Sequence, residues 1–505
     1  MANLTKQELE AKHDLYQQNV INWQLYELVW RSGKDLIDFA LYRHPRESPA
    51  NYKARLKDGY VFNFGKSIID IFNFYLHEKK SIRNLPGLKD DRQWQMFQKD
   101  ADLQGTNYNV LIDEVQKFAS VFGAFGTLVN KRGGLEGTLD AEIKNGIYPY
   151  YALYSPLNIY DWEWKKNKQT HRNELVYLKL KEPGENYLLW WMDHWEQWSL
   201  ENKTKKPMLA DSGDNELEEI PFVWMLNIKD LAYPQIGSSD LVDIANIVVS
   251  ITQNLSCGEE MIKLAGFPIR RQPMSREDDD LSASDDEVET GPRAVEEFDP
   301  EFGANAKPDW MPTEILEPIE ATLKWIDRKS DEIYRIAHLS GVHGQRKSNN
   351  EVASGMALRY EFSQLNEVLN AKSVNQTEAE LQMLRLWLKW QGKEKLIEEV
   401  EIRRSTEFSI DDLSVALENA ITSFRNVVSK TFRVRVMEKI VEHVLPDVSQ
   451  ADKEKISKEI EDNVPDKIEI EQRNSATDSN ISKFVRNANQ SKADHSKDNE
   501  KKYEA

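Results

Sequence analysis

The chain has 505 residues, with 66 Lys and Arg against 85 Asp and Glu, so its formal net charge is −19. Its 14 Trp, 18 Tyr and 18 Phe supply enough apolar surface for several packed cores, which excludes a chain that is disordered throughout. The single cysteine, Cys257, excludes a disulfide framework and a cysteine-rich zinc site, and so acidic a chain is an unusual binder of nucleic acid.

Neither a secretory leader nor a membrane span is expected. The first 22 residues are polar and charged, and the apolar stretches are short and interrupted, whereas a bilayer takes roughly 20 consecutive apolar residues. The composition therefore predicts a soluble protein made inside a cell, without a membrane partner.

The first 135 residues are predicted to be mainly helical. Thr5 is a good N-cap for the polar amphipathic segment that follows it, because its hydroxyl can accept backbone N–H groups of a first turn. Two apolar runs, at 60–76 and 110–129, belong to the same helical stretch.

The pattern changes between residues 146 and 227. Short aromatic segments that partly alternate with polar residues are separated by Pro156, by Pro183 and Gly184, and by a polar loop at 201–219. Aromatic and branched side chains in alternation fit a pleated, half-buried surface, so a mainly antiparallel sheet is predicted. Its strands are expected within 148–154, 158–164, 175–180, 187–198 and 220–226.

Two helices are predicted on either side of a charged excursion. Ser239 and its neighbours form a strong N-cap for a helix over 238–264, whose apolar residues recur at steps of three and four. Several prolines and the acidic tract 277–289 (EDDDLSASDDEVE) predict an irregular excursion with a mobile loop over 265–312. The second helix is predicted over 313–340.

The second of these helices has an apolar stripe and a charged surface. Apolar residues at steps of three and four predict a packing seam for a neighbouring helix. The expected seam consists of Ile319, Leu323, Ile326, Ile333 and Ala337, with Ser330 in the same repeat. The other faces carry Glu317, Glu320, Lys324, Asp327, Arg328, Asp331 and Arg335, and we expect them to face water.

The remainder of the chain is predicted to be helical as far as its tail. A polar loop at 341–354 (GVHGQRKSNNEVAS) precedes a third long helix over 356–390. Shorter helices are expected within 413–428, 432–444 and 451–462. Beyond 465 the chain is poor in apolar residues and rich in Asn, Ser, Lys and Asp, which predicts disorder.

No motif supports catalysis. Gly59, Gly65 and Lys66 nearly match a phosphate-binding loop, but five mostly bulky residues separate the glycines where the motif has four. The better interpretation is a helix start that packs Phe62, Ile68, Ile71 and Phe72 into a core.

Other candidate sites are equally weak. The segment 123–126 (GAFG) lies in the expected helical run and is interpreted as close helix packing. His338 and His343 have no cysteine or well-spaced carboxylate to complete a metal site, and His194 lies among tryptophans of the expected sheet. The acidic run 278–280 lacks a calcium-loop pattern and is interpreted as a solvated loop. No metal or cofactor is expected.

The order of these segments resembles that of portal proteins, the head-to-tail connectors of tailed bacteriophages. A helical N-terminal region and an aromatic-rich sheet precede two long helices around an excursion, a polar loop and a third long helix. The resemblance covers roughly residues 15–465 and rests on order more than on any invariant motif. It is carried by segments 62–76, 119–129, 154–164, 220–227, 237–264, 313–340 and 355–390.

The resemblance implies an α+β, mainly helical subunit of a homo-oligomeric ring, usually of twelve copies, around an axial channel at one capsid vertex. Double-stranded DNA would pass through the channel during packaging and ejection, without sequence specificity. The implied partners are other copies of the chain, the terminase motor, the major capsid and scaffold proteins and a head–tail adaptor. The protein would occur in the virion and, during assembly, in the host cytoplasm, and it would not be an enzyme.

The resemblance also assigns each stretch of the chain to a region of the ring. These regions are a wing at 1–237, stem helices at 238–264 and 313–340, a clip at 265–312, a channel (tunnel) loop at 341–354, a long wing helix and return at 355–409, a helical crown at 410–464 and a tail at 465–505. Polar side chains of the channel loop could touch phosphates without reading bases. They are Gln345, Arg346, Lys347, Ser348, Asn349 and Asn350.

Alternatives remain open at this point. Arg346 and Lys347 could belong to an ordinary solvated loop. The chain could be another structural protein of a phage head or neck, which a ring with an open axial channel would argue against. It could also be a nucleotide-binding enzyme that uses Lys66, whose signature would be ATP binding that a Lys66→Ala variant loses.

Overall fold

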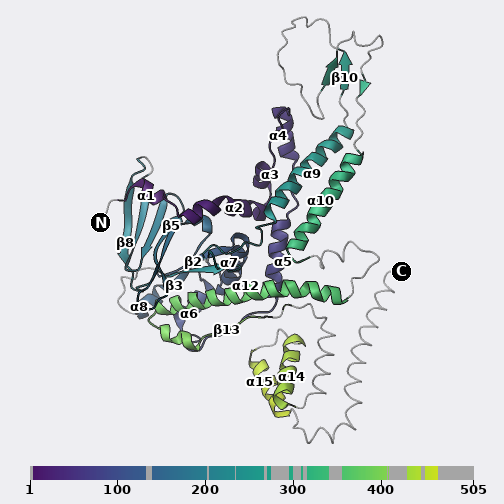
Figure 1. Cartoon of the computed structure of the whole chain (residues 1–505). Helices are drawn as coiled ribbons and strands as arrows, with labels where there is room; N and C mark the ends of the chain where they lie inside the picture. The colour runs from purple at the N-terminus through teal and green to yellow at the C-terminus, as the bar shows by residue number, and fades with distance from the viewer. Residues whose placement is uncertain are drawn as a thin grey trace, which may run out of the picture. The chain divides into compact units, whose positions relative to one another are not determined.

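The computed structural model divides the chain into two compact units, Met1–Phe408 and Ser409–Ala505 (Figure 1). It describes residues 4–131, 139–201, 204–233, 235–266, 270–273, 295–298, 309–310, 316–339, 355–406, 408, 429–444 and 450–463. One large apolar core runs through the first unit, so the expected wing and stem regions are parts of a single folded body. The second unit begins beside the expected crown boundary at 410.

The N-terminal part of the first unit is largely helical. Thr5 begins a capping box, in which its hydroxyl accepts the Glu8 N–H at 3.3 Å and the Glu8 carboxylate accepts the Thr5 N–H at 2.7 Å. The helices are α1 (Lys6–Glu10), α2 (Asp14–Arg31), α3 (Lys34–Ala40), α4 (Pro49–Asp58), α5 (Phe64–Glu78), α6 (Arg92–Lys99) and α7 (Tyr108–Phe122), and a short strand, β1 (Ile82–Asn84), follows α5.

The apolar run 110–129 is not a single helix, so the prediction for its second half was wrong. Gly123 takes a left-handed φ of +94° and ends α7. The chain then forms strand β2 (Ala124–Lys131), whose first six residues are buried. A strand buried on both faces is a continuous apolar run, which its pattern alone does not distinguish from a helix. The glycines of 123–126 therefore end a helix and enter a strand; they do not mark helix packing.

β2 is the middle strand of an antiparallel sheet with the order β3–β2–β9. β3 (Pro149–Tyr154) and β9 (Phe222–Leu226) lie on either side of it, with Gly126 opposite Trp224. The long helix α12 (Gly355–Lys389) packs against β9, and α7 packs against both β2 and β9. The sheet therefore lies inside the main core.

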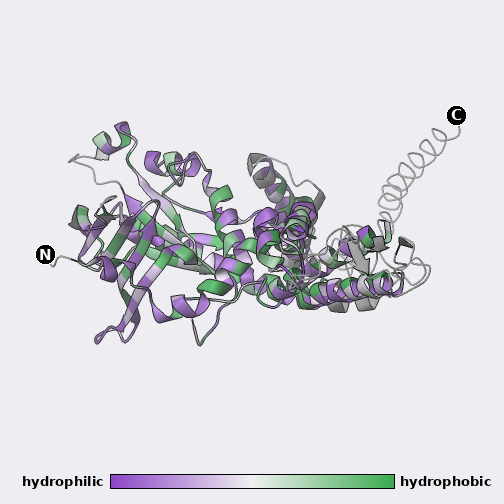
Figure 2. Cartoon of the chain, turned by 90° about the horizontal axis from the view of Figure 1, so that it is seen from above, coloured by the Kyte–Doolittle hydropathy of each residue, from purple (hydrophilic) through white to green (hydrophobic). Residues whose placement is uncertain are grey.

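A second antiparallel sheet has five strands in sequence order. They are β4 (Ile159–Lys166), β5 (Asn173–Glu182), β6 (Asn186–Trp191), β7 (His194–Leu200) and β8 (Pro207–Asp214). The strands carry hydrophilic and hydrophobic residues side by side (Figure 2), as a two-faced sheet requires. Leu178 and Trp190 belong to the main core, while Leu9 of α1 is fully buried in a smaller cluster with Tyr187 and Leu189.

Strand β8 lies in the stretch that the sequence assigned to a polar loop, so that assignment was wrong. Among the residues that the structure describes, β8 pairs with β7 alone, and none of the residues of β8 is buried. An edge strand that buries neither face needs no apolar alternation, so it leaves little signal in the sequence.

The two helices predicted around the excursion are present as α9 (Ala245–Gly266) and α10 (Leu316–Ile336), which pack side by side (Figure 1). α9 begins later than predicted, because residues 240–244 form turns. These turns still bury apolar side chains, which is why they extend the helical pattern in the sequence.

The excursion between these helices contains regular structure, which the sequence did not predict. β10 (Arg270–Pro273) pairs in parallel with β11 (Val295–Phe298) and antiparallel with β12 (Asp309–Trp310). Strands of two to four residues with charged side chains and a proline carry almost no propensity signal. The acidic tract 277–289 lies outside the described residues.

The C-terminal helices follow the prediction where the structure describes them. α12 matches the long helix expected at 356–390, and α14 (Lys430–Val444) packs with α15 (Gln450–Asn463) in the second unit. The expected helix at 413–428 and the tail at 465–505 lie outside the described residues. The remaining elements are α8 (Leu139–Lys144), η1 (Pro156–Asn158), η3 (Glu394–Glu399) and β13 (Glu401–Arg403), the last paired with β1.

The chain is thus an α+β protein in which helices predominate. Within the described ranges, no helix is both long and apolar enough to cross a membrane. The same ranges contain no group of three or more His, Cys, Asp and Glu side chains that could hold a metal ion.

Candidate functional site on the helix pair α9–α10

Two glycines bring separate segments together at the base of α9. Gly237 has a left-handed φ of +61°, and Gly123 at the end of α7 has +94°. A Cβ on Gly237 would lie 2.3 Å from the Gly123 carbonyl oxygen, so the position leaves no room for a side chain. This close approach fixes where α9 leaves the sheet region.

Ser239 ties the following turn to the same end of α7. Its hydroxyl donates to the Val121 carbonyl at 2.5 Å and accepts the Leu241 N–H at 3.0 Å. The apolar stripe predicted for this segment is buried here, in Leu241, Ile244, Ala245, Val248 and Ile251. The base of the pair is therefore part of the main core.

α9 and α10 run antiparallel. Lys329 Nζ donates to Ser250 Oγ at 2.7 Å, and a Cβ on Gly258 would contact Thr322 at 3.9 Å. Rising residue numbers on α9 thus meet falling numbers on α10. The base of α9 consequently lies beside the C-terminal end of α10.

The predicted seam of α10 is buried only in its C-terminal half. Ile326, Ile333 and Ala337 are buried, with at most 6% of their surface exposed. Ile319 is half-buried, and Leu323 is 56% exposed. Within the chain, the apolar stripe therefore extends past the surface that covers it.

Three large apolar side chains are exposed on the half of the pair farther from the base. Leu323 and Trp325 of α10 are 56% and 52% exposed, and Ile262 of α9 is 53% exposed. We call these three the outer apolar residues. Leu323 and Trp325 are two residues apart and therefore lie on different sides of α10, so the three residues do not form one continuous patch.

The charged residues predicted to face water on α10 are all exposed: Glu317, Glu320, Lys324, Asp327, Arg328, Asp331 and Arg335. Lys324 lies 3.7 Å from Glu320, and the Arg335 guanidinium donates to Glu332 at 2.5 and 2.8 Å. The Arg335 hydrogen bond holds the pKa of Glu332 below its ordinary value. Because acidic and basic groups alternate, this surface does not form the basic stripe typical of a tight DNA binder.

α4 and the turn before it brace α9 through a buried ion pair. The Arg55 guanidinium donates to both Glu47 carboxylate oxygens at 2.8 Å, to the Tyr42 carbonyl at 2.6 Å and to Ser256 Oγ of α9 at 3.3 Å. Burial alone would raise the pKa of Glu47, but Arg55 lowers it below its ordinary value. This two-pronged contact is the strong form of a carboxylate–guanidinium pair.

A second buried ion pair joins the base of α9 to α12. Lys372, which is fully buried, donates to Asp240 and lies 3.5 Å from Ser120 Oγ on α7. Asn227 donates to Asp240 at 2.9 Å, and its main-chain oxygen accepts from Asn375 at 3.0 Å. Burial lowers the pKa of Lys372, and the Asp240 carboxylate opposes that shift. The base of α9 is thus held by charge as well as by apolar packing.

Two turns further along α12, Glu380 forms the centre of a third buried cluster. Its carboxylate accepts from Arg83 Nε at 2.5 Å and from the Tyr108 hydroxyl at 2.5 Å, and it is bonded to Arg404. Sequence analysis missed these clusters. Lys372, Gln376 and Glu380 are buried and recur every four residues, but most residues between them are polar as well, so the sequence offers no signal that separates them from an exposed face.

Other residues singled out in the sequence lie at a helix start and in the five-stranded sheet. Ile68 and Phe72 of α5 are buried and Ile71 is half-buried, whereas Phe62 is 43% exposed. The Lys66 N–H donates to the Asn63 side chain at 2.9 Å, so the helix start is capped from within the chain. The His194 ring stacks on Trp191 at 4.5 Å within the five-stranded sheet, as its neighbours indicated.

Part of the candidate site lies outside the described residues. This holds for His343 and for all six channel-loop residues, Gln345, Arg346, Lys347, Ser348, Asn349 and Asn350. A scan against models of known protein families finds no match to the sequence, and a search of curated proteins also finds none.

Proposed function

We propose that the chain is the subunit of a portal ring, a homo-oligomeric conduit for double-stranded DNA at one vertex of a phage capsid. The observation that supports it is the antiparallel pair α9–α10, which flanks a small separate sheet and exposes its outer apolar residues. The pair emerges from a core of helices and sheets, and the long α12 follows it in the chain. This is the order that the resemblance to portal proteins rests on.

Self-association is the simplest way to cover the outer apolar residues. A contact between one face of a subunit and a different face of its neighbour repeats around an axis, and it closes into a ring if the rotation permits. In such a ring α9 and α10 would form the stem, and the sheet β10–β12 would belong to the clip. The mixed charges of α10 would then suit a passage that does not hold the duplex.

The proposed partners follow from this role. DNA would pass the channel loop, where Arg346 and Lys347 would touch phosphates without reading sequence. The clip would meet the terminase motor and later a head–tail adaptor, and the wing and crown would lie beside capsid and scaffold proteins. The proposal includes no catalytic step, and it places the protein in the virion.

Electron microscopy and mass measurement of the purified chain test the ring. We expect rings with an open axial channel, and we expect the triple variant Ile262→Ser, Leu323→Ser, Trp325→Ser to remain monomeric with an unchanged helical circular dichroism spectrum. A matched control, Glu320→Gln with Lys324→Gln and Asp327→Asn, changes exposed polar residues and should still form rings. A wild-type chain that stays monomeric at every salt and protein concentration would refute the proposal.

The DNA contact is tested separately from assembly. Replacing Arg346 and Lys347 by alanine should impair packaging or retention of DNA while rings still form. Rings that package and retain DNA as well as wild type would remove the role proposed for these two residues.

A further inference from the structure

The free edge of strand β9 opens into a pocket that the proposed ring does not use. β9 pairs with β2 on one side, and in the described part of the chain it has no strand partner on the other. Asn227 N–H donates to the Gly123 oxygen and Val129 N–H to the Pro221 oxygen, so odd-numbered residues of β9 face β2. Because the main chain alternates direction, the N–H and C=O groups of Trp224 and Leu226 point toward the free edge.

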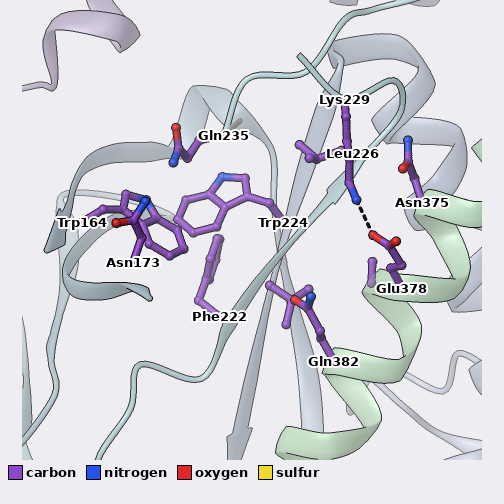
Figure 3. Close-up of a pocket in the computed structure, with 12 residues that line it drawn as sticks. Trp164, Asn173, Phe222, Trp224, Leu226, Lys229, Gln235, Asn375, Glu378 and Gln382 are labelled. Carbon is purple, nitrogen blue, oxygen red and sulfur yellow. Dashed lines mark hydrogen bonds and ion pairs between the residues drawn. The ribbon is translucent and has the colours of Figure 1, made fainter. Parts of the chain in front are cut away.

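The pocket beside this edge has a volume of about 310 Å³ and two unlike walls (Figure 3). One wall is aromatic. The rings of Phe222 and Trp224 meet edge to face with their centroids 4.5 Å apart, and the ring centroid of Trp164 in β4 lies 5.8 Å from that of Trp224. The other wall is the surface of α12, where Ala379 and Gln382 face the same space. The two walls flank the edge of β9, so the pocket is a slot with an open main chain along one side.

The slot carries no uncompensated charge. Its one ammonium group, on Lys229, is paired with its one carboxylate, on Glu378. The remaining polar side chains are amides, on Asn173, Gln235, Asn375 and Gln382. An occupant that matches this environment is uncharged where it is buried, and it offers hydrogen-bond donors and acceptors in alternation.

We propose that this slot binds an extended, uncharged peptide segment of a partner protein, which adds to β9 as the fourth strand of the sheet β3–β2–β9. A peptide main chain supplies N–H and C=O groups at the spacing that Trp224 and Leu226 present. One side chain of the segment would lie on the Trp164–Trp224 wall, and its neighbours would point toward α12. The inference does not depend on the proposed ring, since no ring contact enters it.

The two flanking walls argue against another folded edge as the occupant. β8 and β4 are edge strands that a second copy of the chain could offer, but each is joined to a five-stranded sheet. A sheet edge approaching β9 would bring neighbouring strands toward Trp164 on one side and α12 on the other, whereas a single strand brings none. A glycan could also stack on tryptophan and bond to amides, but its hydroxyl groups do not repeat at the spacing of the main-chain groups of a strand, as those of a peptide do.

A selection experiment with the full-length protein tests the proposal. A display library of random octapeptides is selected on the wild-type protein and, in parallel, on Leu226→Pro. Proline removes the N–H that faces the slot, and edge strands tolerate proline at positions whose N–H is not paired within the sheet. Leu226→Val is the matched control, because it keeps that N–H. The enriched peptides are synthesised with a fluorophore, and their affinity is measured by fluorescence anisotropy.

We expect enrichment on wild type, with affinities that fall at least tenfold on Leu226→Pro or Trp164→Ala and change less than about twofold on Leu226→Val. N-methylation of alternate peptide bonds should also weaken binding at least tenfold, because it removes donors of the peptide and leaves the protein unchanged. The proposal is overturned if no peptide is enriched over the Leu226→Pro selection. It is equally overturned if binding is insensitive to N-methylation, or if maltotriose binds the slot with a Trp164-dependent affinity while peptides do not.

Discussion

Replacing Glu380 by glutamine measures how much the buried charges of α12 stabilise the first unit. The Glu380 side chain is fully buried and is bonded to Arg83 and Arg404, whose side chains are 13% and 6% exposed. It also accepts from the Tyr108 hydroxyl at 2.5 Å. Glutamine keeps nearly the same volume but removes the negative charge, so both guanidinium groups would lose their common counter-charge.

The expected loss is large for one substitution. Removing one partner of a buried ion pair costs about 3–5 kcal/mol, because the other charge stays buried without compensation. Glutamine can still accept one hydrogen bond through its amide oxygen, which offsets about 1 kcal/mol of that cost. We therefore expect the free energy of unfolding at neutral pH to fall by about 3 kcal/mol.

The loss should depend on pH with a defined sign. Burial alone would raise the pKa of Glu380, but Arg404 and Arg83 hold it below the ordinary value of 4.5. A carboxyl group whose pKa is lowered by folding contributes its stability above the unfolded pKa, and the contribution disappears as the pH falls through the folded pKa. The difference between wild type and Glu380→Gln should thus be full at pH 7 and shrink progressively below pH 4.5.

Urea unfolding is monitored by hydrogen exchange of peptides from α12. Because α12 belongs to the first unit, this readout reports on that unit alone. Glu378→Gln is the matched control, because it makes the same chemical change two residues away, where the side chain is 51% exposed and paired with Lys229. Exposed pairs contribute about 0–1 kcal/mol, so this control should unfold close to wild type. Equal losses in the two variants, or a Glu380→Gln loss that does not shrink in acid, would refute the reasoning.

Two further substitutions test the base of α9. Gly237→Ala should lower the free energy of unfolding by more than about 1 kcal/mol, because Gly237 has a positive φ and a Cβ there would lie 2.3 Å from the Gly123 oxygen. Thermal unfolding measures this loss. The control Gly33→Ala should lose less, because φ is also positive there but no atom lies within 4 Å of the added Cβ. Asp240→Asn should cost about 3 kcal/mol in urea unfolding, since it leaves Lys372 buried without a counter-charge, and the double variant Asp240→Leu, Lys372→Met should cost much less. A double variant as unstable as the single one would show that the pair contributes net stability.

Long helices and half-buried strands are predictable because the spacing of their apolar residues can be observed directly in the sequence. α9, α10 and α12 each repeat apolar residues at helical spacing, and β4 alternates aromatic with polar residues. Where one face is buried and the other exposed, burial and periodicity coincide. α10, α12 and β4 therefore appear within a few residues of their expected bounds. α9 begins at Ala245 and not at 238, and the single segment expected at 187–198 forms two strands, β6 and β7.

The features that the sequence did not predict are those whose burial does not follow an apolar periodicity. β2 is buried on both faces and β8 on neither, so the first was taken for helix and the second for loop. The ion clusters around Lys372 and Glu380 place charged residues at buried positions, which an apolar pattern counts as exposed. Their partners, such as Asp240 and Arg83, are more than a hundred residues distant in sequence, so only the fold brings them together.

Burial along α9–α10 separates the contacts that stabilise one chain from the contacts that a neighbouring chain in a ring would add. At the base, buried apolar side chains and the Lys372–Asp240 pair hold the helices to the core. At the other end, Leu323 continues the apolar stripe without cover, and Trp325 is exposed on a different side of α10. Leu323 is ten residues from Ile333 on α10, about 15 Å at ~1.5 Å per residue, and substitutions that far apart usually act independently. Loss of assembly in the outer triple variant would therefore report on the contact between subunits, because the base that folds each one is unchanged.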